Sequence, residues 1–202
     1  CSGTHLKTVA RSAGENLPPE IFPAPHPIKW QAQDGTWVHG IFYPPCNPEY
    51  SGEGLPPAIV YVHGGPTSQA VADYSAERVY FTSRGYAWLE LNYRGSTGYG
   101  RAYQHAQRLR WGEVDVEDAA GAARALVEQG LASERQLVIH GGSAGGYTVL
   151  NTLIRYPGVY KAGICRYGVS NLFSLEMDTH KFEAHYNASL VGKLPAAADR
   201  FH

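Results

Sequence analysis

The residues best suited to chemistry are five consecutive small ones, Gly141-Gly142-Ser143-Ala144-Gly145. They match the G-x-S-x-G pattern and stand between a predicted strand and a predicted helix, which is the context of a nucleophile elbow. Small neighbours let strand and helix approach closely, and the helix N-terminus directs N–H groups toward developing negative charge. The pattern predicts Ser143 as a nucleophile, and the alternative is a glycine-rich loop with an incidental serine.

Two other functions of glycine loops fail on spacing. A phosphate-binding Walker loop needs a lysine after its last glycine, but Tyr147 follows Gly146. A dinucleotide-binding fingerprint that starts at Gly141 needs glycine at its third position, where Ser143 stands.

A second glycine-rich sequence, His63-Gly64-Gly65-Pro66, directly follows a predicted buried strand. Enzymes with a nucleophile elbow draw one oxyanion N–H from such a loop, and the other from the residue after the nucleophile, here Ala144. A tight turn required only by topology is the alternative. His63 precedes Ser143, whereas these enzymes order their triad as serine, acid, histidine, so we do not expect His63 to be the base.

A base and its carboxylate should therefore follow Ser143. The later candidates are His180, His185, His202, Asp178, Glu183 and Asp199. No predicted buried strand precedes the histidines, which favours solvated surface for all three. A metal site from Asp178, His180 and His185 matches no known ligand spacing, so no metal is expected.

The elements around these motifs alternate between strand and helix. We predict strands at 58–62, 86–92, 136–140 and 162–167, and helices at 72–84, 99–109, 115–129 and from about 147 to Pro157. Residues 28–43 predict a hairpin with Asp34-Gly35 at its turn. This alternation indicates an α/β layered sandwich around a mostly parallel sheet.

Composition excludes several classes of protein. With 202 residues, 44% hydrophobic and 17% charged, the chain can bury a core. A net charge of −1 gives no electrostatic footprint for nucleic acid or an anionic membrane, and no apolar run is long enough to span one. Cys1, Cys46 and Cys165 fit neither a disulfide framework nor a zinc site, so a cytoplasmic location is expected.

Four segments, in order, resemble the catalytic domain of the prolyl oligopeptidase family of serine peptidases, closest to its acylaminoacyl-peptidase and dipeptidyl-peptidase-like branch: 63–69, 92–103, 111–131 and 141–147. Segment 178–186 also resembles that family. The resemblance implies an α/β-hydrolase three-layer sandwich with a mostly parallel sheet, lacking the C-terminal strands. Residues 1–24 would be a connector or the end of a β-propeller, and 25–202 the N-terminal part of the peptidase domain.

The resemblance also assigns roles to residues. Ser143 matches the nucleophile, and Gly65 and Ala144 match the residues whose N–H groups form the oxyanion hole. His63 stands where other branches carry a tyrosine whose hydroxyl completes the hole, which leaves an accessory role for His63 open. The family's aspartate and histidine lie beyond residue 202, so this chain alone is expected to be inactive.

The expected activity of the intact protein is hydrolysis of short peptides near their N-terminus, through an acyl-enzyme on Ser143 and without a metal or organic cofactor. No nucleic-acid or membrane partner is expected, and homo-oligomer formation stays open. The alternatives are a carboxylesterase or lipase of the same fold and a non-catalytic interaction domain. The sequence does not distinguish release of acyl-amino acids from release of dipeptides.

Overall fold

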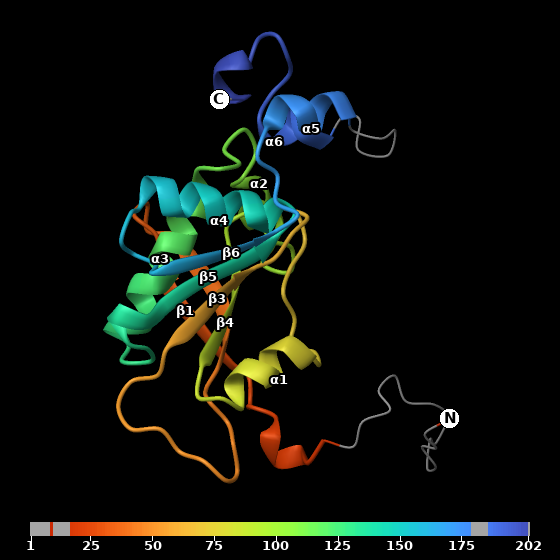
Figure 1. The fold of residues 1–202 in the computed structure, drawn as a ribbon. Helices are drawn as coiled ribbons and strands as arrows, with labels where there is room; N and C mark the ends of the chain where they lie inside the picture. Colours follow the sequence, from red (N-terminus) through yellow and green to blue (C-terminus); the bar gives the residue numbers. More distant parts are fainter. Residues whose placement is uncertain (1–8, 10–16, 179–185, 202) are drawn as a thin grey trace.

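A six-stranded sheet forms the centre of the computed structural model, which describes residues 9, 17–178 and 186–201 (Figure 1). Its strands lie side by side in the order β1-β2-β4-β3-β5-β6. Their bounds are His26–Gln31 (β1), Trp37–Tyr43 (β2), Ala58–Val62 (β3), Ala87–Asn92 (β4), Leu137–Gly142 (β5) and Ala162–Arg166 (β6). Strands β3, β4, β5 and β6 are parallel, while β2 is antiparallel to β1 and β4. The mostly parallel sheet is thus confirmed.

The predicted hairpin is β1 and β2, and its turn contains Asp34 and Gly35. Asp34 Oδ1 accepts a hydrogen bond from the Thr36 N–H at 2.9 Å, and Gly35 has a φ of 82°, which favours glycine. Trp30 and Val38 lie opposite each other in the register and are both buried. The hairpin therefore contributes to the main core rather than lying outside it.

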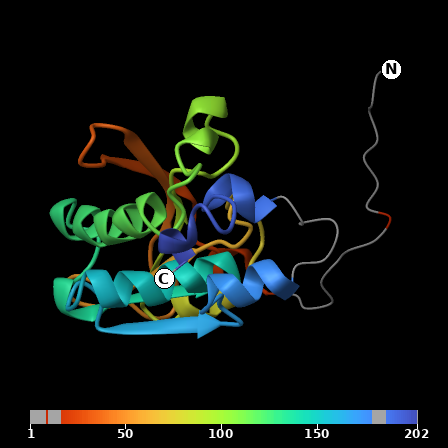
Figure 2. The same cartoon turned by 90° about the horizontal axis from the view of Figure 1, so that it is seen from above.

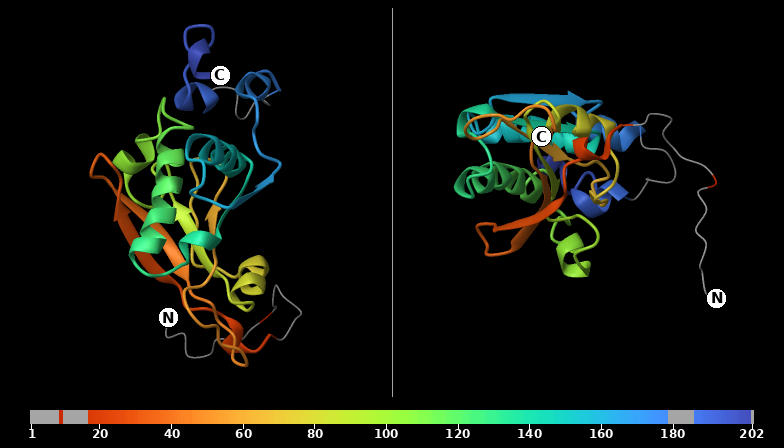
Figure 3. Two further views of the ribbon diagram at one scale, coloured as in Figure 1. Left: turned by 60° about the vertical axis from the view of Figure 1, so that its left-hand side comes forward. Right: turned by 90° about the horizontal axis from the view of Figure 1, so that it is seen from below.

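Helices cover both faces of the sheet. Helices α3 (Val114–Glu128) and α4 (Ala144–Arg155) lie side by side (Figure 2) and share one hydrophobic core with the sheet. Helix α1 (Ala76–Thr82) lies apart from them (Figure 3) and packs on the other face. Strand β3 contacts both sides, because Val60 and Val62 join the α3–α4 core, whereas Ile59 packs with Phe81 of α1.

Two helices are shorter than the sequence predicts. Helix α1 begins at Ala76 because the Ser75 hydroxyl caps it, accepting the Arg78 N–H at 3.3 Å. The Arg78 guanidinium also binds the Asp73 carbonyl, so the residues just before the cap stay outside the helix. The predicted helix at 99–109 is only α2 (Arg101–His105), since the chain then turns and Leu109 takes a φ of 57°.

The last described elements lie beyond the carboxyl ends of the parallel strands (Figure 1). They are α5 (Leu172–Asp178), α6 (Tyr186–Leu190) and the 3-10 turn η3 (Ala198–Phe201). The N–H groups of Leu109 and Trp111 donate to the carbonyls of Ser189 and Leu190, which joins α6 to the segment before α3. The other 3-10 turns are η1 (Pro19–Ile21) and η2 (Glu134–Gln136). Within the described ranges, every helix is too short or too polar to cross a membrane.

Candidate active site

Ser143 occupies a strained turn between β5 and α4. Its φ of 55° and ψ of −125° are unusual for a residue with a side chain, and the residue is exposed. Its N–H donates to the Arg166 carbonyl at 3.1 Å, while its own carbonyl accepts from Tyr147 at 3.2 Å and from Val169 at 3.3 Å. The backbone is thus fixed on both sides, and the hydroxyl lies where a ligand can reach it.

The glycines of the motif are required by close approach of backbones. A Cβ atom at Gly145 would lie 2.1 Å from the Val62 carbonyl oxygen, and one at Gly141 would lie 2.6 Å from the Gly145 carbonyl oxygen. No side chain fits at either position. The end of β3 and the start of α4 therefore touch directly beneath Ser143.

The second glycine-rich loop lies beside the serine. A Cβ at Gly64 would be 3.4 Å from Ser143 Cβ and 3.8 Å from its Oγ. Gly65 follows with a φ of 128°, a conformation that side chains rarely adopt. Ala144 is the first residue of α4, and the first N–H groups of a helix have no partner inside the helix. The two predicted oxyanion residues therefore flank Ser143 on neighbouring segments.

His63 supports this loop and does not reach the nucleophile as a base. Its ring is 6% exposed, and Nδ1 lies 2.8 Å from the Gly64 carbonyl oxygen, so Nδ1 carries the proton. Nε2 then accepts from the Ser96 hydroxyl at 2.8 Å. Burial lowers the pKa of His63 to about 4, so the ring is neutral at physiological pH.

Tyr93 contacts the same loop from the buried side. Its ring stacks on His63 with centroids 4.4 Å apart, and its hydroxyl lies within hydrogen-bond distance of the carbonyls of His63 (3.1 Å) and Pro66 (3.0 Å). Tyr93 and Ser96 lie within the segment 92–103, which the sequence analysis singled out without giving these residues a role. Their proximity to the loop depends on β3 and β4 being neighbours, which no local pattern reveals.

A buried carboxylate of α3 forms a hydrogen bond with the first part of α4, next to the elbow. Asp115 of α3 is fully buried and accepts hydrogen bonds from the Thr148 hydroxyl at 2.6 Å and the Gly112 N–H at 2.7 Å. Burial raises the pKa of Asp115, and these hydrogen bonds oppose that rise. The contact joins α3 to α4 one turn after Ala144.

The later histidines weighed in the sequence are expected at the surface, and no triad partner lies beside Ser143 among the described residues. His180, His185, Glu183 and His202 lie outside them, as does the side chain of Asp178, and within the described ranges no histidine hydrogen-bonds to Ser143 Oγ. The same ranges contain no group of three His, Cys, Asp or Glu residues that could hold a metal ion.

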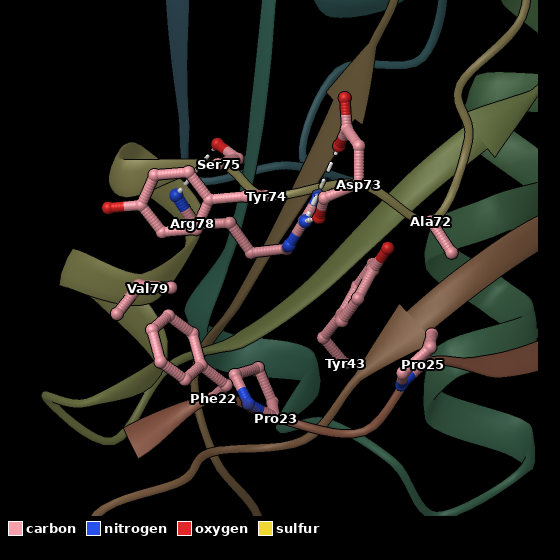
Figure 4. Close-up of a pocket in the computed structure, with 10 residues that line it drawn as sticks. All are labelled: Phe22, Pro23, Pro25, Tyr43, Ala72, Asp73, Tyr74, Ser75, Arg78 and Val79. Atoms are coloured by element: carbon pink, nitrogen blue, oxygen red, sulfur yellow. Dashed lines mark hydrogen bonds and ion pairs between the residues drawn. The ribbon is translucent and has the colours of Figure 1, made fainter. Parts of the chain in front are cut away.

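A partly open pocket exists elsewhere, between the N-terminal segment and α1 (Figure 4). The Arg78 side chain crosses it, 3% exposed, and forms ion pairs with Glu90 and Asp73. The guanidinium also lies 4.1 Å from the centroid of the Tyr43 ring. The charge of Arg78 is therefore already matched by carboxylates of the protein.

The sheet order, the helix on each face and the elbow together define an α/β-hydrolase fold. The profile of the prolyl oligopeptidase family matches residues 72–197. The chain therefore belongs to the prolyl oligopeptidase family, as its motifs predict.

Individual relatives agree with this assignment. The chain is 37% identical over 131 residues to dipeptidyl peptidase family member 6 of Caenorhabditis elegans, covering 62% of this chain and 18% of that protein. It is 33% identical over 153 residues to the acylamino-acid-releasing enzyme of Arabidopsis thaliana, covering 72% and 20%. A solved puromycin-hydrolyzing peptidase of Mycobacterium tuberculosis is 43% identical with a TM-score of 0.91, covering 96% and 31%. The chain thus spans about a fifth of the length of the curated relatives it matches.

Proposed function

We propose that the complete protein is a serine-type peptidase that hydrolyses short peptides near their N-terminus, with Ser143 as its nucleophile. The observation that carries the proposal is the strained, exposed Ser143 with the Gly64–Gly65 turn beside its Oγ. Relatives named as dipeptidyl peptidase, acylamino-acid-releasing enzyme and puromycin-hydrolyzing peptidase support the same class. In this proposal residues 25–202 form part of the catalytic domain, and 1–24 form the connector to a preceding domain.

The proposed reaction proceeds through two tetrahedral states. Ser143 Oγ attacks the scissile carbonyl carbon and passes its proton to a histidine outside the described residues. The N–H groups of Gly65 and Ala144 stabilise the oxyanion, and collapse breaks the C–N bond while the histidine returns the proton to the leaving amine. Water then adds to the acyl-enzyme with the same histidine as base, releasing the acid and regenerating Ser143.

A fluorophosphonate probe tests the nucleophile in the complete protein. We expect covalent labelling of the wild type at Ser143, and loss of both labelling and peptide turnover in Ser143→Ala. The matched control is Ser51→Ala, which removes an exposed hydroxyl from a loop far from the elbow in sequence. It should label and turn over like the wild type. Turnover retained by Ser143→Ala would overturn the proposal.

Substrate panels test the finer class. Acetylated and free N-terminal dipeptide anilides, compared with simple p-nitrophenyl esters, separate a peptidase from an esterase of the same fold. We expect anilide hydrolysis to depend on Ser143. Ester hydrolysis without any anilide hydrolysis would replace the peptidase assignment by a carboxylesterase.

A further inference from the structure

We propose that Tyr186 of α6 is a positioning residue that holds the turn carrying Gly65, so that α6 completes the oxyanion hole. The inference rests on the proposed function, because it assigns a role to Gly65 in the reaction. Tyr186 lies outside both glycine-rich motifs. Tyr186 and its partner Thr67 are 119 residues apart in the sequence.

One hydroxyl makes both contacts with Thr67. The Thr67 N–H donates to Tyr186 Oη at 3.0 Å, and Thr67 Oγ1 lies 2.6 Å from the same oxygen. Because Oη already accepts from the N–H, its own hydrogen can be donated to Oγ1. Thr67 is therefore held through its backbone as well as its side chain, and the backbone contact fixes the direction of a peptide plane.

That peptide plane belongs to the same tight turn as Gly65. A Cβ built on Gly65 would be 3.1 Å from the Thr67 nitrogen and 3.0 Å from Ser68 Cβ. Tyr93 holds the turn from the buried side through the Pro66 carbonyl at 3.0 Å. Tyr186 holds the same peptide group through the Thr67 N–H, so the peptide bond that follows Pro66 is fixed at both its carbonyl and its N–H, one residue after Gly65.

The ring of Tyr186 packs against the hydrophobic cluster that contains the other residue of the proposed hole, Ala144. The same cluster includes Trp111 and Leu190. Tyr186 is thus the side chain whose ring lies against the Ala144 cluster and whose hydroxyl holds the Gly65 turn. Loss of the hydroxyl alone would keep the ring in place and release only the turn.

This arrangement predicts a defect in the transition state rather than in substrate binding. Oxyanion donors act on charge that develops after the substrate has bound, so a displaced Gly65 N–H lowers kcat and leaves KM nearly unchanged. Deleting a whole donor lowers kcat about 100-fold or more, and we expect a misaligned donor to lower it about 10-fold.

The test is Tyr186→Phe in the complete protein. We expect kcat for a dipeptide anilide to fall about 10-fold, with KM changed less than about twofold. Affinity for a peptide boronic acid, which forms a tetrahedral adduct on the nucleophile, should fall by a similar factor. Affinity for a product peptide should not change. Thr67→Val should lower kcat less, and the double variant should be no slower than Tyr186→Phe, because both remove the same contact.

The matched control is Tyr160→Phe. Its buried hydroxyl donates to the Ala119 carbonyl at 2.7 Å, in the α3–α4 core away from the elbow, so the change affects stability and leaves kcat at the wild-type value. Unchanged kcat and boronate affinity in Tyr186→Phe would overturn the inference. Equal loss of affinity for boronate and product peptide would also overturn it, by indicating a binding role. Activity retained in Ser143→Ala would instead overturn the proposed function.

Discussion

The His63 ring is built into the loop in its neutral form. Nδ1 donates to the Gly64 carbonyl oxygen and Nε2 accepts from the Ser96 hydroxyl, so the neutral ring uses both of its nitrogens. Burial lowers the pKa of His63 to about 4, and the hydrogen bond to the Gly64 carbonyl opposes part of that fall. A buried, neutral histidine that holds a glycine turn has a structural role in this loop, apart from any direct part in proton transfer.

This pKa makes the contribution of His63 to stability depend on pH. The unfolded histidine titrates near its usual 6.5 and the folded one near 4, so below pH 6.5 the unfolded state binds more protons. The stabilisation by His63 is present above pH 6.5 and is lost as the pH falls toward 4, by roughly 3 kcal/mol in total. His63→Gln, which keeps a neutral polar group, should show no such loss.

The measurement is the difference in free energy of unfolding between wild type and His63→Gln at pH 7.5 and at pH 4, from urea titrations. The comparison with the variant is needed because burial also raises the pKa of Asp118 to about 6. Over part of this pH range, Asp118 therefore stabilises the folded protein as the pH falls, which is opposite to the effect of His63. The contribution of Asp118 to the free energy of unfolding is the same in wild type and His63→Gln, so it cancels in the difference. An equal difference at both pH values would contradict the prediction.

At the scale of elements, the elbow depends on how closely β3 and α4 approach. Gly145 allows this close approach, because a Cβ there would lie 2.1 Å from the Val62 carbonyl oxygen and 2.9 Å from the His63 carbonyl oxygen. Both are backbone atoms, so a larger residue has to move the strand or the helix. Such a shift would displace Ser143 and the glycine turn together.

Gly145→Ala should therefore destabilise the protein by about 2 kcal/mol or more, within the range of overpacking in a core. It should also abolish labelling by a fluorophosphonate while Ser143 is still present. Gly52→Ala is the control, because a Cβ there meets nothing within 4 Å. Differential scanning calorimetry and labelling can be run on the same samples. Wild-type labelling and melting temperature in Gly145→Ala would show that the close approach is not required.

The sequence predicts the elements better than their contacts. The strands and the elbow follow local patterns: a short apolar run bounded by turn residues, and small residues where a strand meets a helix. Helix α1 is overestimated because the bond from Arg78 to the Asp73 carbonyl lies outside any periodic pattern. Ser96, Tyr93 and Tyr186 could not be assigned from spacing, because they reach the glycine turn only after β4 pairs with β3 and α6 packs beside Trp111.

At the scale of the whole molecule, one buried arginine joins three parts of the fold. Arg94 follows β4 and is 1% exposed, and its guanidinium binds Asp34 in the hairpin turn as well as Glu117 and Asp118 in α3. The distances to these carboxylates are each 2.7 Å. The hairpin edge of the sheet is thus fastened to the helical layer. The opposite edge of the sheet is β6.

Strand β6 pairs only with β5 among the described residues, and all five of its residues are exposed. Ile164 in its centre is 40% exposed. An exposed, apolar edge with free backbone groups is a template for pairing with another chain. We therefore expect the 202-residue chain on its own to self-associate as its concentration rises, through β6.

Ile164→Lys tests this by placing a charge in the middle of the edge, a device by which natural sheets block such pairing. Sedimentation velocity over a range of concentrations should show less association for Ile164→Lys than for the wild-type chain. Val71→Lys is the control, because Val71 is 46% exposed in a loop outside β6 and the substitution adds the same charge. If both variants reduce association equally, net charge rather than the edge is responsible. A wild-type chain that stays monomeric throughout would show that β6 is protected in another way.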